Sequence, residues 1–182
     1  MGEILIVPVE MQFVERSVLR AVAAYVGDFY SGFGLSVRIL HKIDIRPFMD
    51  GYNETRRQFL GRTFILGLSG LRRAAAVLGI TDADLYEEGM NFIFGLAHPY
   101  FRTAVISLHR LRPEFYGEPG DRNLLKERAV KEAMHELGHV FGLTHCPDPK
   151  CVMHFSNSIL DTDLKGRDYC TSCRKKLEEM LR

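Results

Sequence analysis

The sequence predicts an α/β domain with a mixed twisted sheet of about five strands, two long helices and a third helix, followed by a small C-terminal lobe. Three observations predict this fold. Short apolar runs alternate with amphipathic stretches up to about residue 123, as in a sheet with crossover helices. A helical stretch with histidines opposite its apolar stripe follows, and all four cysteines lie after residue 145. We therefore expect one domain, residues 1–182.

Residues 3–43 predict a βαβ unit. EILIVPV (3–9) is a short β-branched run typical of a buried strand. LSVRILHKI (35–43) alternates like a second strand after the glycine-rich SGFG. Between them, residues 13–30 place apolar side chains at helical spacing, namely Val14, Val18, Ala21, Val22, Tyr25, Val26 and Phe29. The two strands should be parallel with a right-handed crossover.

The middle of the chain predicts a second helix and three more strands. Residues 54–79 suit a long helix, although three glycines weaken its continuity. ITDADLY (80–86), GMNFIFGLAHP (89–99) and RTAVISLHRL (102–111) predict strands, and the last two are joined closely enough to be neighbours. RPEFYGEPGDRN (112–123) has the composition of turns, and Asp121 or Asn123 can cap the helix that follows it.

Length and charge limit the partners of this protein. A chain of 182 residues buries roughly two thirds of its unfolded surface in one core. Its net charge of +1 gives no long-range field for nucleic acid or an anionic membrane. The N-terminal MGEILIVPVEMQF lacks the basic start of a signal peptide, and no run approaches the roughly 18 apolar residues of a membrane span. We expect a cytoplasmic monomer without nucleic-acid or membrane partners.

HELGH (135–139) lies on a predicted helix. From Leu125 onward an apolar stripe recurs every four residues, at Ala129, Ala133, Leu137 and Phe141. His135 and His139 lie on the other side, one turn apart, so both imidazoles can reach one ion at roughly 2.0–2.1 Å. Glu136 is rotated about 100° away, beside such a metal. A carboxylate there can take a proton from a zinc-bound water and deliver it to a leaving amine, which is the chemistry of peptide hydrolysis.

The next residues make this pattern more specific. Gly142 and His145 extend it to HELGHVFGLTH, which far fewer unrelated sequences match. Gly142 suits a helix end in the left-handed conformation, which turns the chain so that His145 can return as third ligand. The alternative is an ordinary helix with solvated or packed histidines. We interpret KERAVKE (126–132) as the solvated face of the helix.

The cysteines form two close pairs, Cys146 with Cys151 and Cys170 with Cys173. Spacings of four and two residues suit a tetrahedral thiolate zinc with a structural role. Such a site would supply folding energy to a lobe too small to bury much core. Three alternatives remain: two disulfides in a secreted protein, a redox CTSC pair, or Cys146 in place of His145 as a catalytic ligand.

HELGHVFGLTH followed by CVM (151–153) resembles the metzincin clan of zinc endopeptidases, in which a methionine turn lies beneath a three-histidine zinc site. With CTSC (170–173) downstream, the arrangement resembles more narrowly the archaemetzincin family. The motif covers residues 135–173. NFIFGLA and AVISLHRL also resemble strands of that family.

The resemblance implies a zinc metallopeptidase with two zinc ions. The catalytic ion would be held by His135, His139 and His145, with Glu136 as general base and acid and Met153 beneath. The structural ion would be held by the four cysteines. The helix would then be the active-site helix, ending an N-terminal subdomain (1–142), and residues 143–182 would form a zinc-bound C-terminal subdomain.

The resemblance also implies that NFIFGLA is an antiparallel edge strand bordering the cleft. There a peptide substrate would pair with the strand and contact Phe92, Phe94, Gly95 and Ala97. The alternative function is a non-catalytic zinc protein that binds peptides or a partner in the same cleft. His98 follows this strand and is a candidate cleft residue, whereas His41 and His109 are expected to be packed or at the surface.

One departure from the pattern concerns the methionine turn. Astacin-like metzincins carry a tyrosine at the position of Phe155, and that tyrosine can stabilise the oxyanion. Zinc and protonated Glu136 would then carry more of the stabilisation, or His154, Asn157 or a residue elsewhere would contribute.

Overall fold

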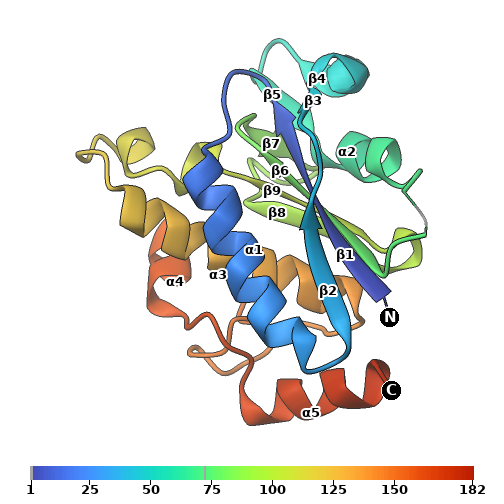
Figure 1. Ribbon diagram of the computed structural model, residues 1–182. Coiled ribbons are helices and arrows are strands. Elements are labelled where there is room, and N and C mark those ends of the chain that lie inside the picture. Colours follow the sequence, from blue (N-terminus) through green and yellow to red (C-terminus); the bar gives the residue numbers. More distant parts are fainter. Residues whose placement is uncertain (1, 72) are drawn as a thin grey trace.

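The protein is described by a computed structural model covering residues 2–71 and 73–182 (Figure 1). Its centre is a mixed sheet with strand order β2-β1-β6-β9-β8, and β3 also pairs with β1. All pairings are parallel except that of β8 with β9, which is antiparallel. The strands are β1 (Gly2–Glu10), β2 (Leu35–Ile39), β3 (Ile43–Asp44), β6 (Ala76–Thr81), β8 (Gly95–His98) and β9 (Thr103–Ser107). The predicted mixed α/β sheet is confirmed.

The first three long elements form the predicted βαβ unit. Helix α1 (Arg16–Ser31) connects β1 to β2, and the strands pair in parallel from Gly2↔Leu35 to Ile6↔Ile39. Ile4 and Ile6 face the same core cluster as Val22 and Val26 of the helix, and all four side chains are fully buried.

The predicted long helix over residues 54–79 is wrong. Helix α2 spans only Gly61–Leu68. It is preceded by β4 (Tyr52–Asn53) and β5 (Gln58–Leu60), which form a small sheet with β7 (Leu85–Tyr86). The strand expected at 80–86 is really β6, which begins at Ala76 and is buried at all six positions. A central parallel strand buried on both faces lacks alternation, so its apolar run resembles a buried helix.

The strands expected at 89–99 and 102–111 exist but are shorter. Strand β8 covers only the second half of the first run, and a 3-10 helix, η2 (Pro99–Phe101), separates it from β9. After β9 come η3 (His109–Leu111) and η4 (Pro113–Tyr116), and a further 3-10 helix, η1 (Arg46–Gly51), follows β3. The predicted position of β8, antiparallel at the sheet edge, is confirmed.

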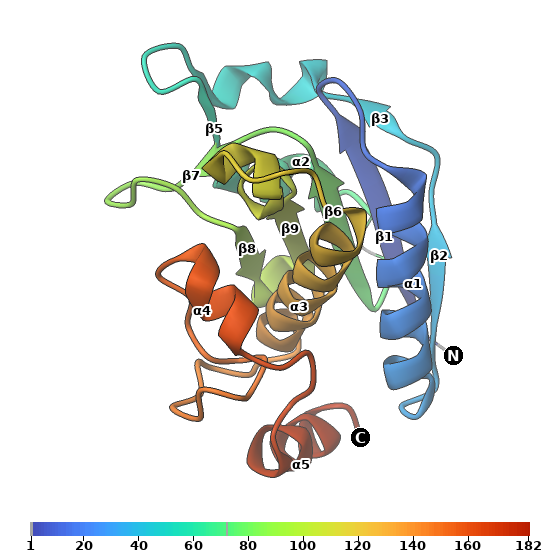
Figure 2. The ribbon, with the colours of Figure 1, turned by 90° about the vertical axis from the view of Figure 1, so that its left-hand side faces the viewer.

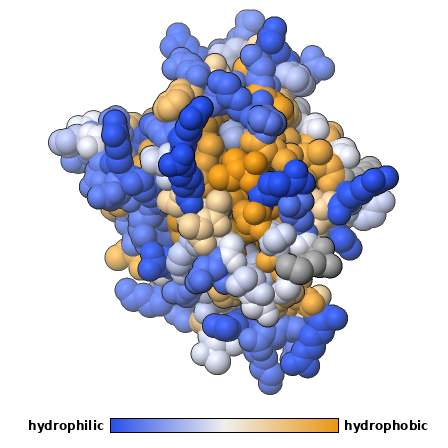
Figure 3. Space-filling view, in the orientation of Figure 1, coloured by the Kyte–Doolittle hydropathy of each residue, from blue (hydrophilic) through white to orange (hydrophobic). Residues whose placement is uncertain are grey.

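Helices cover the two faces of the sheet unequally (Figures 1 and 2). Helices α1 and α3 (Arg122–Val140) pack on one face, and α2 packs on the other. Because α2 has only eight residues, apolar residues gather at the surface beside it, over β1 and β2 (Figure 3).

The predicted apolar stripe of α3 is buried, with Ala129, Ala133 and Leu137 fully inaccessible. The cap of this helix is Asp121, one of the two predicted candidates, which accepts from the Asn123 and Leu124 amides.

The C-terminal part adds α4 (Ile159–Leu164) and α5 (Thr171–Met180). Helix α4 is not among the elements predicted from the sequence. Arg128 of α3 binds both oxygens of Asp163 at 2.7 Å, and Lys131 Nζ donates to the Thr162 and Asp163 carbonyls at 3.0 Å. These bonds hold α4 against α3. Among the described residues, no helix is long and apolar enough to cross a membrane.

Candidate metal centres and catalytic cleft

His135, His139 and His145 converge on one point. Each offers one ring nitrogen, and these atoms lie within 4.8 Å of one another. The Nε2 atoms of His135 and His139 are 3.1 Å apart. Two Zn–N bonds at a tetrahedral angle would place the nitrogens about 3.3–3.4 Å apart. The spacing of the two α3 histidines therefore fits a shared zinc ion.

Hydrogen bonds orient two of these rings. Nδ1 of His135 lies 2.8 Å from the Val152 carbonyl, and Nδ1 of His139 lies 2.8 Å from the Leu143 carbonyl. Because a carbonyl accepts, each Nδ1 carries the proton and each Nε2 keeps its lone pair for a metal. Burial lowers the pKa of all three histidines, and the positive charge of Lys165 lowers it further. Neutral imidazole is the form that binds zinc.

The turn after α3 brings the third histidine to the other two. Gly142 has φ of +97°, as the sequence predicted, and its amide donates to the His139 carbonyl. A residue with a side chain would be strained in this conformation. The His145 ring then lies 4.8 Å from the His139 ring and 5.4 Å from the His135 ring, between centroids.

Met153 packs directly beneath the active-site helix. Its side chain is fully buried. A Cβ added at Gly138, which lies between the two α3 histidines in sequence, would collide with Met153 Sδ. The Met153 carbonyl accepts from the Cys146 amide at 2.9 Å, which joins this turn to the segment that carries His145.

Glu136 lines the same cleft as the three histidines, a cavity of about 670 Å³. Burial raises the pKa of its carboxyl well above the usual value, the negative charge of Glu132 raises it further, and the charge of Lys165 opposes both. A Cβ at Gly95 of β8 would lie 2.6 Å from Glu136 Oε1. The carboxyl group therefore rests on the backbone of the edge strand, where only glycine leaves room.

The strand side of the cleft includes all four predicted residues, Phe92, Phe94, Gly95 and Ala97. Pro99 continues the lining, whereas His98 does not belong to it and packs its ring 4.7 Å from that of Phe101. His98 therefore loses its expected place at the cleft.

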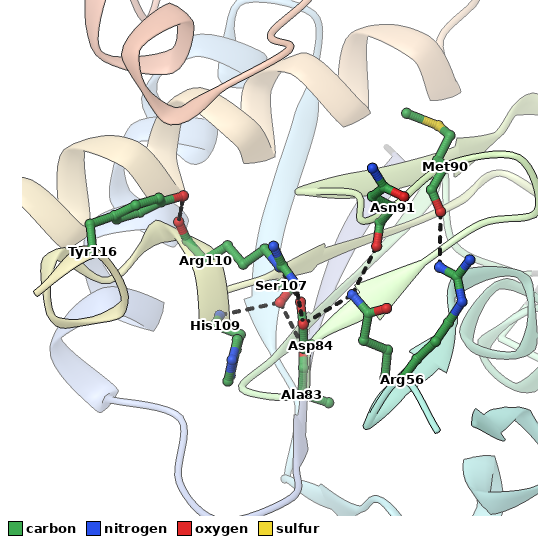
Figure 4. Close-up of polar contacts among 10 residues, drawn as sticks. Arg56, Ala83, Asp84, Met90, Asn91, Ser107, His109, Arg110 and Tyr116 are labelled. Carbon is green, nitrogen blue, oxygen red and sulfur yellow. Dashed lines mark hydrogen bonds and ion pairs between the residues drawn. The ribbon is translucent and has the colours of Figure 1, made fainter. Parts of the chain in front are cut away.

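A partly buried network holds the segment that leads into β8 (Figure 4). Arg110 donates to both oxygens of Asp84 at 2.8 Å. The side-chain amide of Gln58 donates to Asp84 at 3.0 Å and to the Asn91 carbonyl at 3.1 Å. These bonds connect the small sheet to the strand side of the cleft.

On the opposite side of the cleft, only one of the two named candidates to replace the missing tyrosine is present. Phe155 lines it, with its ring 4.8 Å from that of His145, and Asn157 lines it too. His154 does not line it, and its Nδ1 lies 3.0 Å from the Cys146 carbonyl. Of the residues proposed in place of the missing tyrosine, only Asn157 lies at the cleft.

Sequence reasoning missed three charged cleft residues, Glu87, Glu132 and Lys165. The interpretation of KERAVKE as a solvated face is wrong, because Arg128, Lys131 and Glu132 are 6%, 6% and 3% exposed. Three charged residues within five positions of a helix resemble a surface pattern, and their partners lie about 30 residues later, in and after an unpredicted helix. No local signal in the sequence reveals that pairing.

The four cysteines form a separate cluster. Their sulfur atoms lie within 4.8 Å of one another, and none is in a disulfide. The sulfurs of Cys146 and Cys170 are 3.8 Å apart, which matches the separation of about 3.8 Å that Zn–S bonds of about 2.3 Å give in a tetrahedron. Cys146 thus joins the cysteines and not the histidines. The geometry fits one four-thiolate ion better than two disulfides.

Helix α5 and the residue that caps it carry two of the four cysteines. Cys170 immediately precedes the helix, and its amide donates to Cys151 Sγ at 3.3 Å. A hydrogen bond from the Cys173 amide lowers the pKa of Cys170, whereas burial raises the pKa of Cys151 and Cys173. Two buried thiols that resist ionisation need a cation beside them to become ligands.

Comparisons with known proteins cover nearly the whole chain. The sequence model of peptidase family M54 matches residues 3–179. The archaemetzincin of Pyrococcus furiosus is 58% identical over 180 residues, covering 97% of this chain and 94% of the relative. That of Saccharolobus solfataricus is 36% identical, covering 99% and 96%.

Solved structures show the same likeness. The archaemetzincin of Methanopyrus kandleri has a TM-score of 0.83 at 36% identity, covering 99% of this chain and 95% of the other. A zinc-dependent peptidase of Methanocorpusculum labreanum has a TM-score of 0.80 at 29% identity, covering 94% and 99%.

Proposed function

Because the chain belongs to peptidase family M54, the family of the archaemetzincins, and is a zinc metallopeptidase acting on peptides or proteins, we propose that Glu136 is its general base and acid. The observation that carries this proposal is that Glu136 and the three histidines line one cleft. Zinc, when bound there, supplies a water of lowered pKa and polarises the peptide carbonyl. Glu136 takes the proton of the attacking water and delivers it to the leaving amine.

The surroundings of Glu136 suit this double task. Its raised pKa brings the carboxyl nearer to neutrality, where one group can both accept and donate a proton efficiently. The backbone of Gly95 leaves no space for the carboxyl to turn toward β8. The carboxyl is therefore packed against the edge strand that borders the cleft.

The proposal includes two zinc ions with separate roles. The histidine site is the catalytic one, because His145 is exposed and opens onto the cleft. The cysteine site is structural, because four thiolates fill a tetrahedral coordination sphere and leave no position for substrate. It ties the loop after His145 to α5.

Strand β8 is the proposed binding surface for the peptide backbone. Among the described residues it pairs only with β9, and its free edge borders the cleft. An extended peptide can add to such an edge by main-chain hydrogen bonds, which aligns it for attack. Phe92, Phe94 and Ala97 would then contact its side chains. Asn157 is the side chain of the described part of the cleft best suited to donate to the oxyanion.

The experiment compares zinc-loaded wild type with Glu136→Ala on a mixed peptide library, after both have been shown to hold the same amount of zinc. Wild type should cut peptides at a rate at least hundredfold above the variant, since Glu136 supplies proton transfer. Equal rates would refute the catalytic role. Binding of peptides without any cleavage would favour a peptide-binding protein that uses the same cleft.

A further inference from the structure

The cleft contains a buried cation that proton transfer by Glu136 does not use. The side chain of Lys165, just after α4, is 1% exposed and lines the cleft. Its Nζ lies 2.9 Å from Glu132 Oε1, but without the angle of a hydrogen bond, and it finds no other acceptor among the described residues. An ammonium group has three N–H donors, so donors remain for a ligand.

Glu132 is the charge paired with Lys165, and the other charges described around it have partners of their own. Arg128 already takes both oxygens of Asp163, and Lys131 donates to two backbone carbonyls of α4. Glu132 also accepts from the Thr162 hydroxyl at 3.2 Å. The cluster thus holds three basic side chains and the two acidic side chains of Glu132 and Asp163, with the carboxyl of Glu136 close enough to feel the charge of Lys165. Lys165 is the basic group of this cluster that borders the cleft.

A second polar group in the cleft is also without a partner. Ser156 Oγ and Lys165 Nζ are the two buried side-chain atoms of the described residues that make no hydrogen bond. Both residues line this one cleft. Buried polar groups nearly always have a hydrogen-bond partner, and a buried group without one costs free energy. Two such donors in one cleft indicate a ligand that brings acceptor oxygens.

Resting on the proposed peptidase function, we propose that Lys165 is a specificity-determining residue. It receives a carboxylate, from Asp or Glu, on the substrate residue at one side of the scissile bond, and Ser156 donates to the same side chain. An amide side chain offers one acceptor oxygen and is accepted less well. An apolar side chain would cover both donors without accepting a hydrogen bond from either. The site should therefore reject peptides with such a side chain strongly.

The test uses matched peptides with Glu, Gln or Leu at each of the two positions flanking the scissile bond. We expect wild type to prefer Glu over Leu at one position by about 10- to 100-fold in kcat/KM, as for a hydrogen bond to a charged group. In Lys165→Met that ratio should fall at least tenfold. Lys131→Met is the matched control, because Lys131 is also buried but does not line the cleft, and its ratio should match that of wild type.

Breaking a buried ion pair can prevent folding, so a second variant removes both partners, Lys165→Met with Glu132→Met. It should fold and also lose the preference. An unchanged Glu to Leu ratio in a folded Lys165 variant would overturn the inference. A uniform loss for all peptides would also overturn it, since that result indicates a general catalytic or structural role.

A binding measurement separates this inference from the proposed function. Fluorescence anisotropy of labelled Glu and Leu peptides is recorded with wild type and Lys165→Met, whether or not cleavage occurs. Preference for the Glu peptide that depends on Lys165, without cleavage, would refute the peptidase proposal and support the inference. Cleavage without that preference would support the peptidase proposal and refute the inference about Lys165.

Discussion

Gly95→Ala tests whether the edge strand positions the carboxyl group of Glu136. The new Cβ would lie 2.6, 2.7 and 2.9 Å from Oε1, Cγ and Cδ of Glu136, where an ordinary contact begins at 3.4 Å. The carboxyl group must therefore move by about 0.8 Å, and a misplacement of about 1 Å costs on the order of a hundredfold in rate. We expect kcat to fall by about that factor, equivalent to about 2.7 kcal/mol.

The assay is steady-state cleavage of one peptide, with zinc content measured on the same samples. Metal content should not change, because the three atoms nearest to the added methyl group all belong to Glu136. Gly70→Ala is the control, since a Cβ there meets nothing within 4 Å. If Gly95→Ala keeps kcat within twofold of wild type at equal zinc, the carboxyl is not positioned by this contact and the reasoning fails.

Three further predictions concern stability, pH and metal. Tyr169→Phe should lower the free energy of unfolding by about 1–3 kcal/mol in urea denaturation, because the buried hydroxyl bonds the Met134 carbonyl at 2.6 Å and the Tyr30 hydroxyl at 2.7 Å. Amide hydrogen bonds lower the pKa of Asp121, so its stabilisation is complete above the unfolded pKa and is lost as pH falls through the folded pKa. In urea denaturation at a series of acid pH values, the free energy of unfolding of Asp121→Ala should lack this contribution to the pH dependence. A chelator should abolish peptide cleavage, and zinc should restore it; cleavage that survives full zinc removal would contradict the metal requirement.

Much of the site could be predicted because its residues are close in sequence. His135 and His139 lie one turn apart on one helix, and Gly142 imposes the turn that returns His145. The assignment of Cys146 to the second cluster follows from the same local chain. Helical periodicity and glycine conformation are local properties, so the sequence predicts them well.

The features that could not be predicted depend on contacts distant in sequence. Strand β6 is buried at every position because it is covered on both faces, and this environment cannot be distinguished from a buried helix by periodicity. The burial of Arg128, Lys131 and Glu132 depends on α4, which brings Asp163 and the lysine after it against α3. Side chains that would be solvated in isolation therefore become part of the interior and, for Glu132, part of the cleft.

Zinc content per chain tests the central claim, two separate metal sites, most directly. It is measured on wild type, on His135→Ala with His139→Ala, and on Cys170→Ser with Cys173→Ser. We predict two ions in wild type and one in each variant, with the cysteine variant markedly less stable and the histidine variant folded but inactive. Loss of both ions in each variant, or a single ion in wild type, would contradict the division of the sites between His145 and Cys146.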